Sequence, residues 1–195
     1  LLDDFIQSVF IDMFGDPVSN PKGWNEIKVE NVCKSIVGGG TPSKNNSNYY
    51  NGEIPWVTPK DMKSRYIRDS IDHITKDAVL NSSVKMIPPD SILMVIRSGI
   101  LKRYIPIAIN KCEVTVNQDM KAFIVDAEIA TVQYLMFALV LLQSLLLKHV
   151  RGVTADNIEF SLIKELLIPL PPLDLQNQFA QIVEKTEQQR ELLEK

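Results

Sequence analysis

The pattern of apolar and polar positions divides the chain into a helical start, a β-rich middle and a helical end. Near the start, apolar residues recur with spacings of 4, 3 and 4, which predicts an amphipathic helix over residues 1–14. Its apolar stripe consists of Leu2, Ile6, Val9 and Met13. Gly15 and Pro17 follow directly, and we expect them to end the helix, because glycine accepts a left-handed cap and proline cannot continue a helix.

The middle of the chain alternates short β-rich runs with turn-forming residues. The predicted strands are residues 27–32, 54–57, 92–96, 105–109, 114–116 and 122–125. Asp126 is the expected N-cap of a long helix that runs to about His149, and a shorter helix is expected over residues 161–166.

The end of the chain predicts a second amphipathic helix. Prolines over residues 169–173 indicate a stiff extended linker, because each fixes φ and lacks an N–H donor. A heptad seam follows, formed by Leu175, Phe179, Ile182, Thr186, Gln189 and Leu193. Since the seam has no partner in its own stretch, it must pack on the first helix, on another part of the chain or on another chain. We expect the terminal helices to form a bundle separate from the globular domain, either antiparallel within the chain or between two copies as a homodimer.

Together these patterns predict an α+β fold with a curved β-sheet and packed helices, flanked by long, coiled-coil-like helical ends. We expect a helical segment at 1–20, a globular domain at 21–169 and a helical segment at 170–195. The chain has 195 residues, which is long enough for one substantial core.

Composition narrows the class of protein. Two cysteines, Cys33 and Cys112, lie far apart without metal-ligand spacing, so neither a disulfide scaffold nor a zinc module is expected. No basic-then-apolar leader opens the chain and no run is long enough for a membrane span, so we expect a cytoplasmic protein.

Charge is unevenly distributed along the chain. The net charge is −3, but residues 31–125 carry 13 Lys and Arg against 8 acidic residues. A basic middle between acidic ends indicates a local surface for an anionic partner such as DNA, although chance variation of solvated charge is the alternative.

Three polar segments in the middle are candidate DNA-binding loops. The first follows glycines 38–40 and offers Thr41, Ser43 and Lys44; it lacks the spacing of a nucleotide-binding loop, and an ordinary surface loop is the alternative. The second follows a strongly apolar strand and presents a basic finger. The residues of this finger are Arg97, Ser98, Lys102 and Arg103.

The third segment offers Asn117, Gln118 and Lys121 at a strand entrance. Side-chain amides pair with adenine edges in DNA, whereas a structural turn at Asn117 is the competing interpretation. One catalytic hypothesis overlaps this segment: Asp90, Asp119 and Lys121 match the PD…DxK pattern of magnesium-dependent nucleases. No cofactor loop, metal cluster or histidine-based triad is expected elsewhere.

Several separated motifs in this sequence resemble the specificity subunits of Type I restriction–modification enzymes. They include the GGTPS segment at 39–43, the segment 49–58 with Asp61, and the proline linker with Gln176. The resemblance implies a target recognition domain that reads one half of a split DNA target and has no catalysis of its own. It also implies assembly with a methyltransferase subunit and a motor–nuclease subunit.

The resemblance and the polar loops together define the candidate DNA-binding residues. Besides those in the three loops we expect Lys60 and Arg65 to contribute, with Arg151 and Thr154 as weaker candidates, because helix-end capping explains the latter pair. The stand-alone nuclease remains the alternative function at this point.

Overall fold

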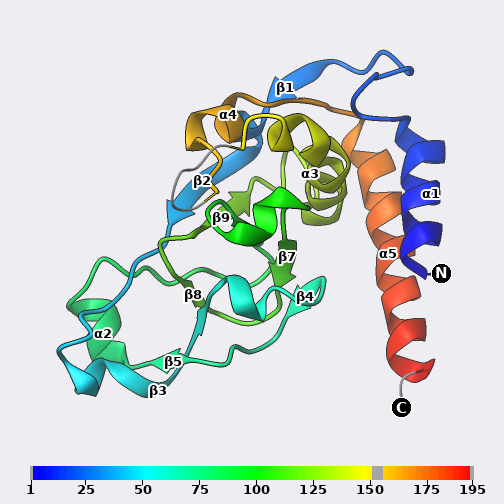
Figure 1. Ribbon diagram of the computed structural model, residues 1–195. Coiled ribbons are helices and arrows are strands. Elements are labelled where there is room, and N and C mark those ends of the chain that lie inside the picture. The colour runs from blue at the N-terminus through cyan, green and yellow to red at the C-terminus, as the bar shows by residue number, and fades with distance from the viewer. Residues whose placement is uncertain (1, 151–155, 194–195) are drawn as a thin grey trace.

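The main scaffold of the structure is a central β-sheet. The computed structural model describes residues 2–150 and 156–193, and within them the strands form three sheets (Figure 1). The largest has five strands in the order β2 (Cys33–Gly38), β9 (Met120–Val125), β6 (Ile92–Val95), β7 (Ile107–Asn110) and β4 (Tyr66–Ile67). The pairs β2–β9, β9–β6 and β6–β7 are antiparallel, whereas β4 runs parallel to β7.

Strand β6 lies at the centre of this sheet. Its residues Ile92, Leu93, Met94 and Val95 are all fully buried. A strand that is covered on both faces needs apolar side chains on both, which explains why the run is uninterrupted rather than alternating. The strand predicted at this position is therefore confirmed.

Two smaller sheets flank the central one. They consist of β5 (His73–Ile74), β3 (Tyr50–Val57) and β8 (Thr115–Val116), and of β1 (Glu26–Lys28) and β10 (Leu167–Pro169). The first carries the short helix α2 (Lys76–Leu80) and a small core of its own, in which Ile74, Ala78 and Val84 are buried. In Figure 1 this lobe lies at the lower left, away from the long helices.

Most of the strands predicted for the middle of the chain are present in the structure, but several short strands are not predicted. The predicted strand 27–32 is wrong over its last four residues, because η1 (Val29–Val32) is a 3-10 helix. The sequence pattern does not predict β2, β4, β5 or β10. Lys34 and Ser35 are exposed on β2, so that strand lacks the alternation that marks a half-buried strand.

Helix α3 (Val132–Leu147) is an almost entirely apolar helix packed against β7. The helix start predicted at Asp126 is wrong, because the Asp126 carbonyl accepts hydrogen bonds from the N–H groups of Ile129 and Ala130 in a separate turn. Thr131 is the true N-cap, and its hydroxyl oxygen accepts the Tyr134 N–H at 3.2 Å.

The two terminal helices, α1 (Leu2–Phe14) and α5 (Leu173–Leu193), lie side by side and run antiparallel (Figure 1). Phe179 near the start of α5 contacts Phe14 at the end of α1, with ring centroids 5.4 Å apart. At the opposite ends, Arg190 donates a 2.5 Å hydrogen bond to Asp3. Antiparallel pairing within the chain, one of the two arrangements expected, is therefore confirmed.

The helical ends are not a separate bundle, and that expectation is wrong. Phe10 stacks on Tyr134 of α3 at 5.5 Å, and Phe179 meets Phe137 of α3 edge to face at 5.4 Å. Aromatic side chains from three helices thus join the helix pair to the globular core in one continuous cluster.

The buried stripe of α5 differs from the predicted seam. Phe179 and Thr186 are buried as expected, but Gln176 and Val183 are buried where Leu175 and Ile182 were expected. This shift arises because α5 packs on both α1 and α3. Gln176 tolerates burial because it accepts the Thr131 N–H and donates to the Pro171 carbonyl.

Some predicted positions lie outside the described part of the chain. These are Arg151, Thr154 and the side chain of Leu193. In the part that the structure describes, no helix combines the length and the apolar character that a bilayer crossing requires.

Candidate nucleic-acid interface

The glycine loop after β2 lies directly against the turn between β8 and β9. The Gly40 N–H donates to the Val116 carbonyl at 3.0 Å, and the Thr41 hydroxyl donates to the Gln118 side-chain oxygen. Trp56 of β3 donates its indole N–H to the Gly40 carbonyl at 3.1 Å. Two of the three predicted loops therefore form one surface.

This close approach requires glycine at two positions. A Cβ atom on Gly39 would lie 1.8 Å from the Asn117 carbonyl oxygen, and one on Gly40 would lie 2.4 Å from the Ser83 hydroxyl oxygen. The glycines thus serve to bring backbone against backbone, and neither has a positive φ among the glycines that the structure describes.

The basic finger after β6 reaches the same turn through an ion pair. Arg97 donates its Nε–H to Asp119 Oδ1 at 2.6 Å, and both the Ile96 and the Arg97 backbone N–H groups donate to the Asp119 carbonyl. The Arg97 side chain is 47% exposed and the Asp119 side chain 23% exposed. All three predicted loops therefore meet at one edge of the central sheet.

Asn117 holds the turn rather than facing outward. It is only 8% exposed, its side-chain oxygen accepts the Asp119 N–H at 3.0 Å, and its amide donates to Asp119 Oδ2 at 3.1 Å. The competing interpretation, a structural turn at Asn117, describes these contacts. Gln118, in contrast, is exposed.

The other cationic side chains of the basic finger and the 117–121 turn differ in their contacts. Lys121 lies over the ring of Phe160 at 4.6 Å, where α4 (Phe160–Glu165) begins. Lys102 lies 3.8 Å from Asp156, which also accepts the Ser98 N–H through its carbonyl. Ser98 is the N-cap of the 3-10 helix η4 (Gly99–Lys102), and Arg103 after it is exposed.

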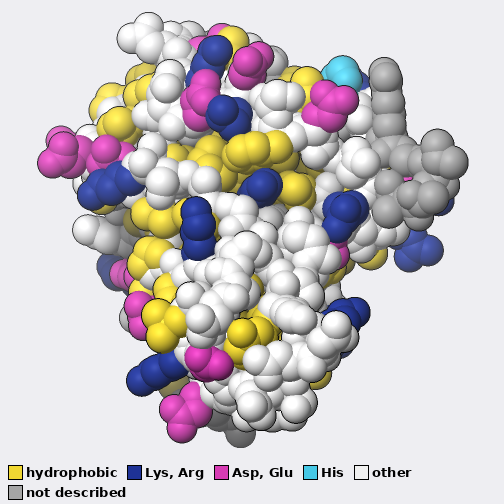
Figure 2. All heavy atoms as spheres, turned by 90° about the vertical axis from the view of Figure 1, so that its left-hand side faces the viewer, with side chains coloured by type: hydrophobic (Ala, Val, Ile, Leu, Met, Phe, Trp, Pro, Cys, Tyr) yellow, Lys and Arg dark blue, Asp and Glu magenta, His cyan; other side chains and the backbone are white. Residues whose placement is uncertain are grey.

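Figure 2 shows the face of the molecule that carries the lower end of β2 in Figure 1. Lys and Arg side chains are spread across the middle of this face, whereas acidic side chains lie mostly toward its edges. Ser43 and Lys44, on the glycine loop, are exposed. The distribution suits an anionic partner.

Two predicted residues are not brought to this surface by any contact in the described chain. Lys60, in η3 (Pro59–Asp61), pairs with Asp72 at 2.6 Å. Arg65 turns toward the helix pair, where it forms ion pairs with Asp3 of α1 and Glu187 of α5.

Arg65 joins the globular domain to both terminal helices. Its guanidinium also lies 4.9 Å from the centre of the Phe137 ring. Burial opposes ionisation of Asp3, but hydrogen bonds and charge from Arg190 and Arg65 outweigh it and lower the pKa of Asp3. Arg65 is therefore placed to orient the domain on the helices.

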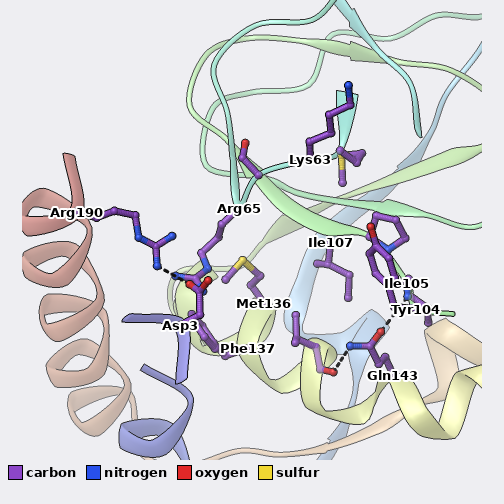
Figure 3. Close-up of a pocket in the computed structure, with 14 residues that line it drawn as sticks. Asp3, Lys63, Arg65, Tyr104, Ile105, Ile107, Met136, Phe137, Gln143 and Arg190 are labelled. Carbon is purple, nitrogen blue, oxygen red and sulfur yellow. Dashed lines mark hydrogen bonds and ion pairs between the residues drawn. The ribbon is translucent and has the colours of Figure 1, made fainter. Parts of the chain in front are cut away.

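A cleft of about 440 Å³ opens beside this junction (Figure 3). Asp3, Arg65 and Arg190 converge on one side of it, and Gln143 of α3 lies on the other. The Gln143 side chain is already engaged, because its oxygen accepts the Ile105 N–H and its amide donates to the Val140 carbonyl.

The geometry does not support the nuclease hypothesis. Ile92 pairs with Phe123 and Val95 with Met120, so Asp90 and Asp119 lie at opposite ends of the antiparallel pair β6–β9. At about 3.3 Å per residue they are roughly 20 Å apart, too far to bind one metal ion. Asp90 instead pairs with Lys111 at 2.6 Å. Among the described residues, no group of three or more His, Cys, Asp or Glu could hold a metal ion.

Sequence reasoning missed the supporting roles of Asp119, Asp156 and Phe160. The Asn-x-Asp pattern at 117–119 is a signal for an Asx turn, but it does not reveal which cation the aspartate binds. The contacts of Asp156 and Phe160 depend on tertiary packing and leave no local signal.

Comparison with known proteins identifies the family. The model of the Type I restriction modification DNA specificity domain matches residues 21–195. Over 151 residues the chain is 39% identical to the Type I restriction enzyme EcoR124I/EcoR124II specificity subunit of Escherichia coli, covering 76% of this chain and 37% of that protein. Over 186 residues it is 31% identical to the MjaIX specificity subunit of Methanocaldococcus jannaschii, covering 90% and 42%.

Solved structures share the fold. The HsdS subunit from Thermoanaerobacter tengcongensis superposes with a TM-score of 0.67 at 18% identity, over 99% of this chain and 45% of that chain. A chain from a structure of complex assembly in the type I R-M system gives a TM-score of 0.71 at 18% identity, over 98% and 45%.

The chain belongs to the family of Type I restriction–modification DNA specificity domains. The predicted family and the α+β fold class are thereby confirmed. The chain spans about two fifths of the length of the curated relatives that it matches.

Replacement of Gly39 by alanine tests how closely the glycine loop packs against the 117–121 turn. Because the new Cβ would collide with the Asn117 carbonyl, we expect Gly39→Ala to lower the free energy of unfolding by about 1–3 kcal/mol, measured by urea denaturation. Gly99→Ala is the matched control, since a Cβ on Gly99 meets nothing within 4 Å. Equal unfolding midpoints for the two variants would contradict the close approach.

Proposed function

We propose that this chain reads one part of a split DNA target through the surface formed by its three polar loops. The observation that carries the proposal is the convergence of the glycine loop, the basic finger and the 117–121 turn at one sheet edge. Loops far apart in sequence present hydroxyl, amide and cationic groups there, which are the groups that contact phosphates and base edges.

Exposure and contacts divide the predicted residues into three groups. Residues proposed to face DNA are exposed or partly exposed on the three loops: Thr41, Ser43, Lys44, Arg97, Ser98, Lys102, Arg103, Gln118 and Lys121. Asn117 and Arg65 are proposed as supporting residues, because their polar groups are engaged within the protein. Lys60 remains a candidate for a phosphate contact at the rim, because it is exposed.

The proposed partners follow from the family. The curated relatives are named as specificity subunits of Type I restriction enzymes. We therefore propose that this chain directs a methyltransferase subunit and a motor–nuclease subunit to its target in the cytoplasm. The domain division at 1–20, 21–169 and 170–195 is proposed to separate DNA reading from assembly.

A second recognition domain would be needed to read the other part of a split target. We propose that a second copy of this chain supplies it through the paired helices α1 and α5. Phe179 is buried in the core and is not available for such contact. Among the described side chains of the pair, the exposed large apolar residues are Phe5, Ile11 and Leu192, which are 50%, 38% and 72% exposed.

Selection from a random double-stranded DNA library tests the reading function. The purified chain should enrich a short recurring motif, because base-edge contacts discriminate at about 1–3 kcal/mol per base pair. Binding should also weaken steeply as salt rises, since phosphate contacts release counterions. Sequencing of the bound DNA gives the result, and enrichment of no motif at any salt concentration would contradict the proposal.

Sedimentation equilibrium tests the proposed dimer. Phe5→Glu combined with Leu192→Glu should shift the chain toward monomer, because buried apolar contact is replaced by charge at the free end of the helix pair. The matched control is Gln7→Glu with Gln188→Glu, which adds the same charge at exposed positions of the same helices. If wild type sediments as a monomer throughout, or if both double variants behave alike, the helix pair is not the dimer surface.

A further inference from the structure

Arg97 differs from Lys102, the other exposed cation of the finger with a carboxylate partner, because Arg97 donates a hydrogen bond to its carboxylate, whereas Lys102 lies 3.8 Å from Asp156. Asp119 Oδ1 accepts the Arg97 Nε–H at 2.6 Å, and Asp119 Oδ2 accepts the Asn117 amide at 3.1 Å. The Asp119 backbone N–H in turn donates to the Asn117 side-chain oxygen at 3.0 Å. Both oxygens of the carboxylate are thus engaged, and Asn117 itself is almost completely buried.

The backbone of Arg97 is fixed as well. Its N–H donates to the Asp119 carbonyl at 3.2 Å, and the residue forms a β-bridge with Asn157. Within the described chain, the hydrogen bonds of Arg97 use its backbone and Nε, which leaves the two terminal Nη groups of a 47% exposed side chain for a ligand. A planar fork of donors held in this way suits two acceptors that lie side by side.

We propose that Arg97 reads the major-groove edge of a guanine in the target, and that Asp119 and Asn117 are its positioning residues. This inference rests on the proposed DNA-reading function, and it names guanine as the base that Arg97 contacts. Guanine presents O6 and N7 as neighbouring acceptors, which match the Nη fork of arginine.

The charge at the site favours a base edge over a phosphate. The Asp119 carboxylate opposes the Arg97 charge, which weakens attraction to a phosphate but leaves the donor geometry toward a neutral guanine edge intact. An ion pair with a half-exposed arginine also contributes little to folding stability, so orientation is the main effect of the contact. Arg103 shows the contrast: its side chain is exposed and forms no ion pair in the described part of the chain.

Library selection with three variants tests the proposal. Arg97→Lys keeps the charge but removes the fork, and it should lower the preference for guanine at one position roughly 5- to 150-fold. Asp119→Asn removes the negative charge that orients Arg97, so it should lower the guanine preference at the same position. It should also strengthen binding to all sequences at low salt. Arg103→Lys, the matched control, should leave every base preference unchanged.

A modified base distinguishes guanine from phosphate as the ligand. Replacing the selected guanine by 7-deazaguanine removes the N7 acceptor, so it should weaken wild type and weaken Arg97→Lys less, because a lysine ammonium can contact N7 but lacks the fork. If Arg97→Lys instead weakens all sequences equally and keeps every preference, Arg97 contacts a phosphate and the proposal is overturned while the reading function stands. If wild type itself selects no motif, the proposed function fails and this inference fails with it.

Discussion

The candidate surface depends on the register of β9 between its two neighbours. Lys121 of β9 pairs with Gly38 of β2 on one side and with Met94 of β6 on the other. This register carries the end of β2, the end of β6 and the start of β9 to the same edge of the sheet. The glycine loop, the basic finger and the 117–121 turn emerge there together. A shift of one residue would turn the buried side chains of β9 outward, so the hydrophobic core enforces the register.

The three loops at this edge of the sheet are held together by contacts that are mostly polar. Gly39 and Gly40 allow the loop after β2 to approach the backbone of the 117–121 turn, and Asp119 connects that turn to Arg97. The helix pair is attached by a different kind of contact, in which aromatic rings of α1, α3 and α5 interlock. Arg65 adds ion pairs to both helices at the same junction. The surface proposed to read DNA and the surface proposed for assembly therefore share one core. Mostly polar contacts form the first, whereas aromatic contacts and ion pairs attach the second.

The sequence predicts much of this arrangement but not its contacts. The terminal helices, the central strand β6 and the three polar loops follow from local periodicity and turn residues, which tertiary packing reinforces. The start of α3 is misplaced because Asp126 and Thr131 are both good N-caps, and only packing selects the second. The stripe of α5 is misassigned because a heptad pattern assumes one partner helix, whereas α5 has two.

Individual site residues are harder to predict than loops. Arg65 and Arg97 both lie in polar segments of the basic middle, yet one turns inward to Asp3 and Glu187 and the other stays half exposed beside Asp119. Their partners are 62, 122 and 22 residues away in sequence, so no local pattern distinguishes the two arginines. For the same reason, the sequence does not reveal that Asp90 and Asp119 lie at opposite ends of a strand pair, although the two residues match a nuclease pattern.

Amide hydrogen–deuterium exchange of the chain, with and without the DNA that it selects, tests the central claim most directly. If the register of β9 builds one reading surface, DNA should slow exchange together in residues 38–44, 97–103 and 117–121, because all three segments meet at one edge. Helix α2, in the lobe with its own small core, should exchange at an unchanged rate. Protection confined to α2 or to the terminal helices, with the three loops unaffected, would contradict the account.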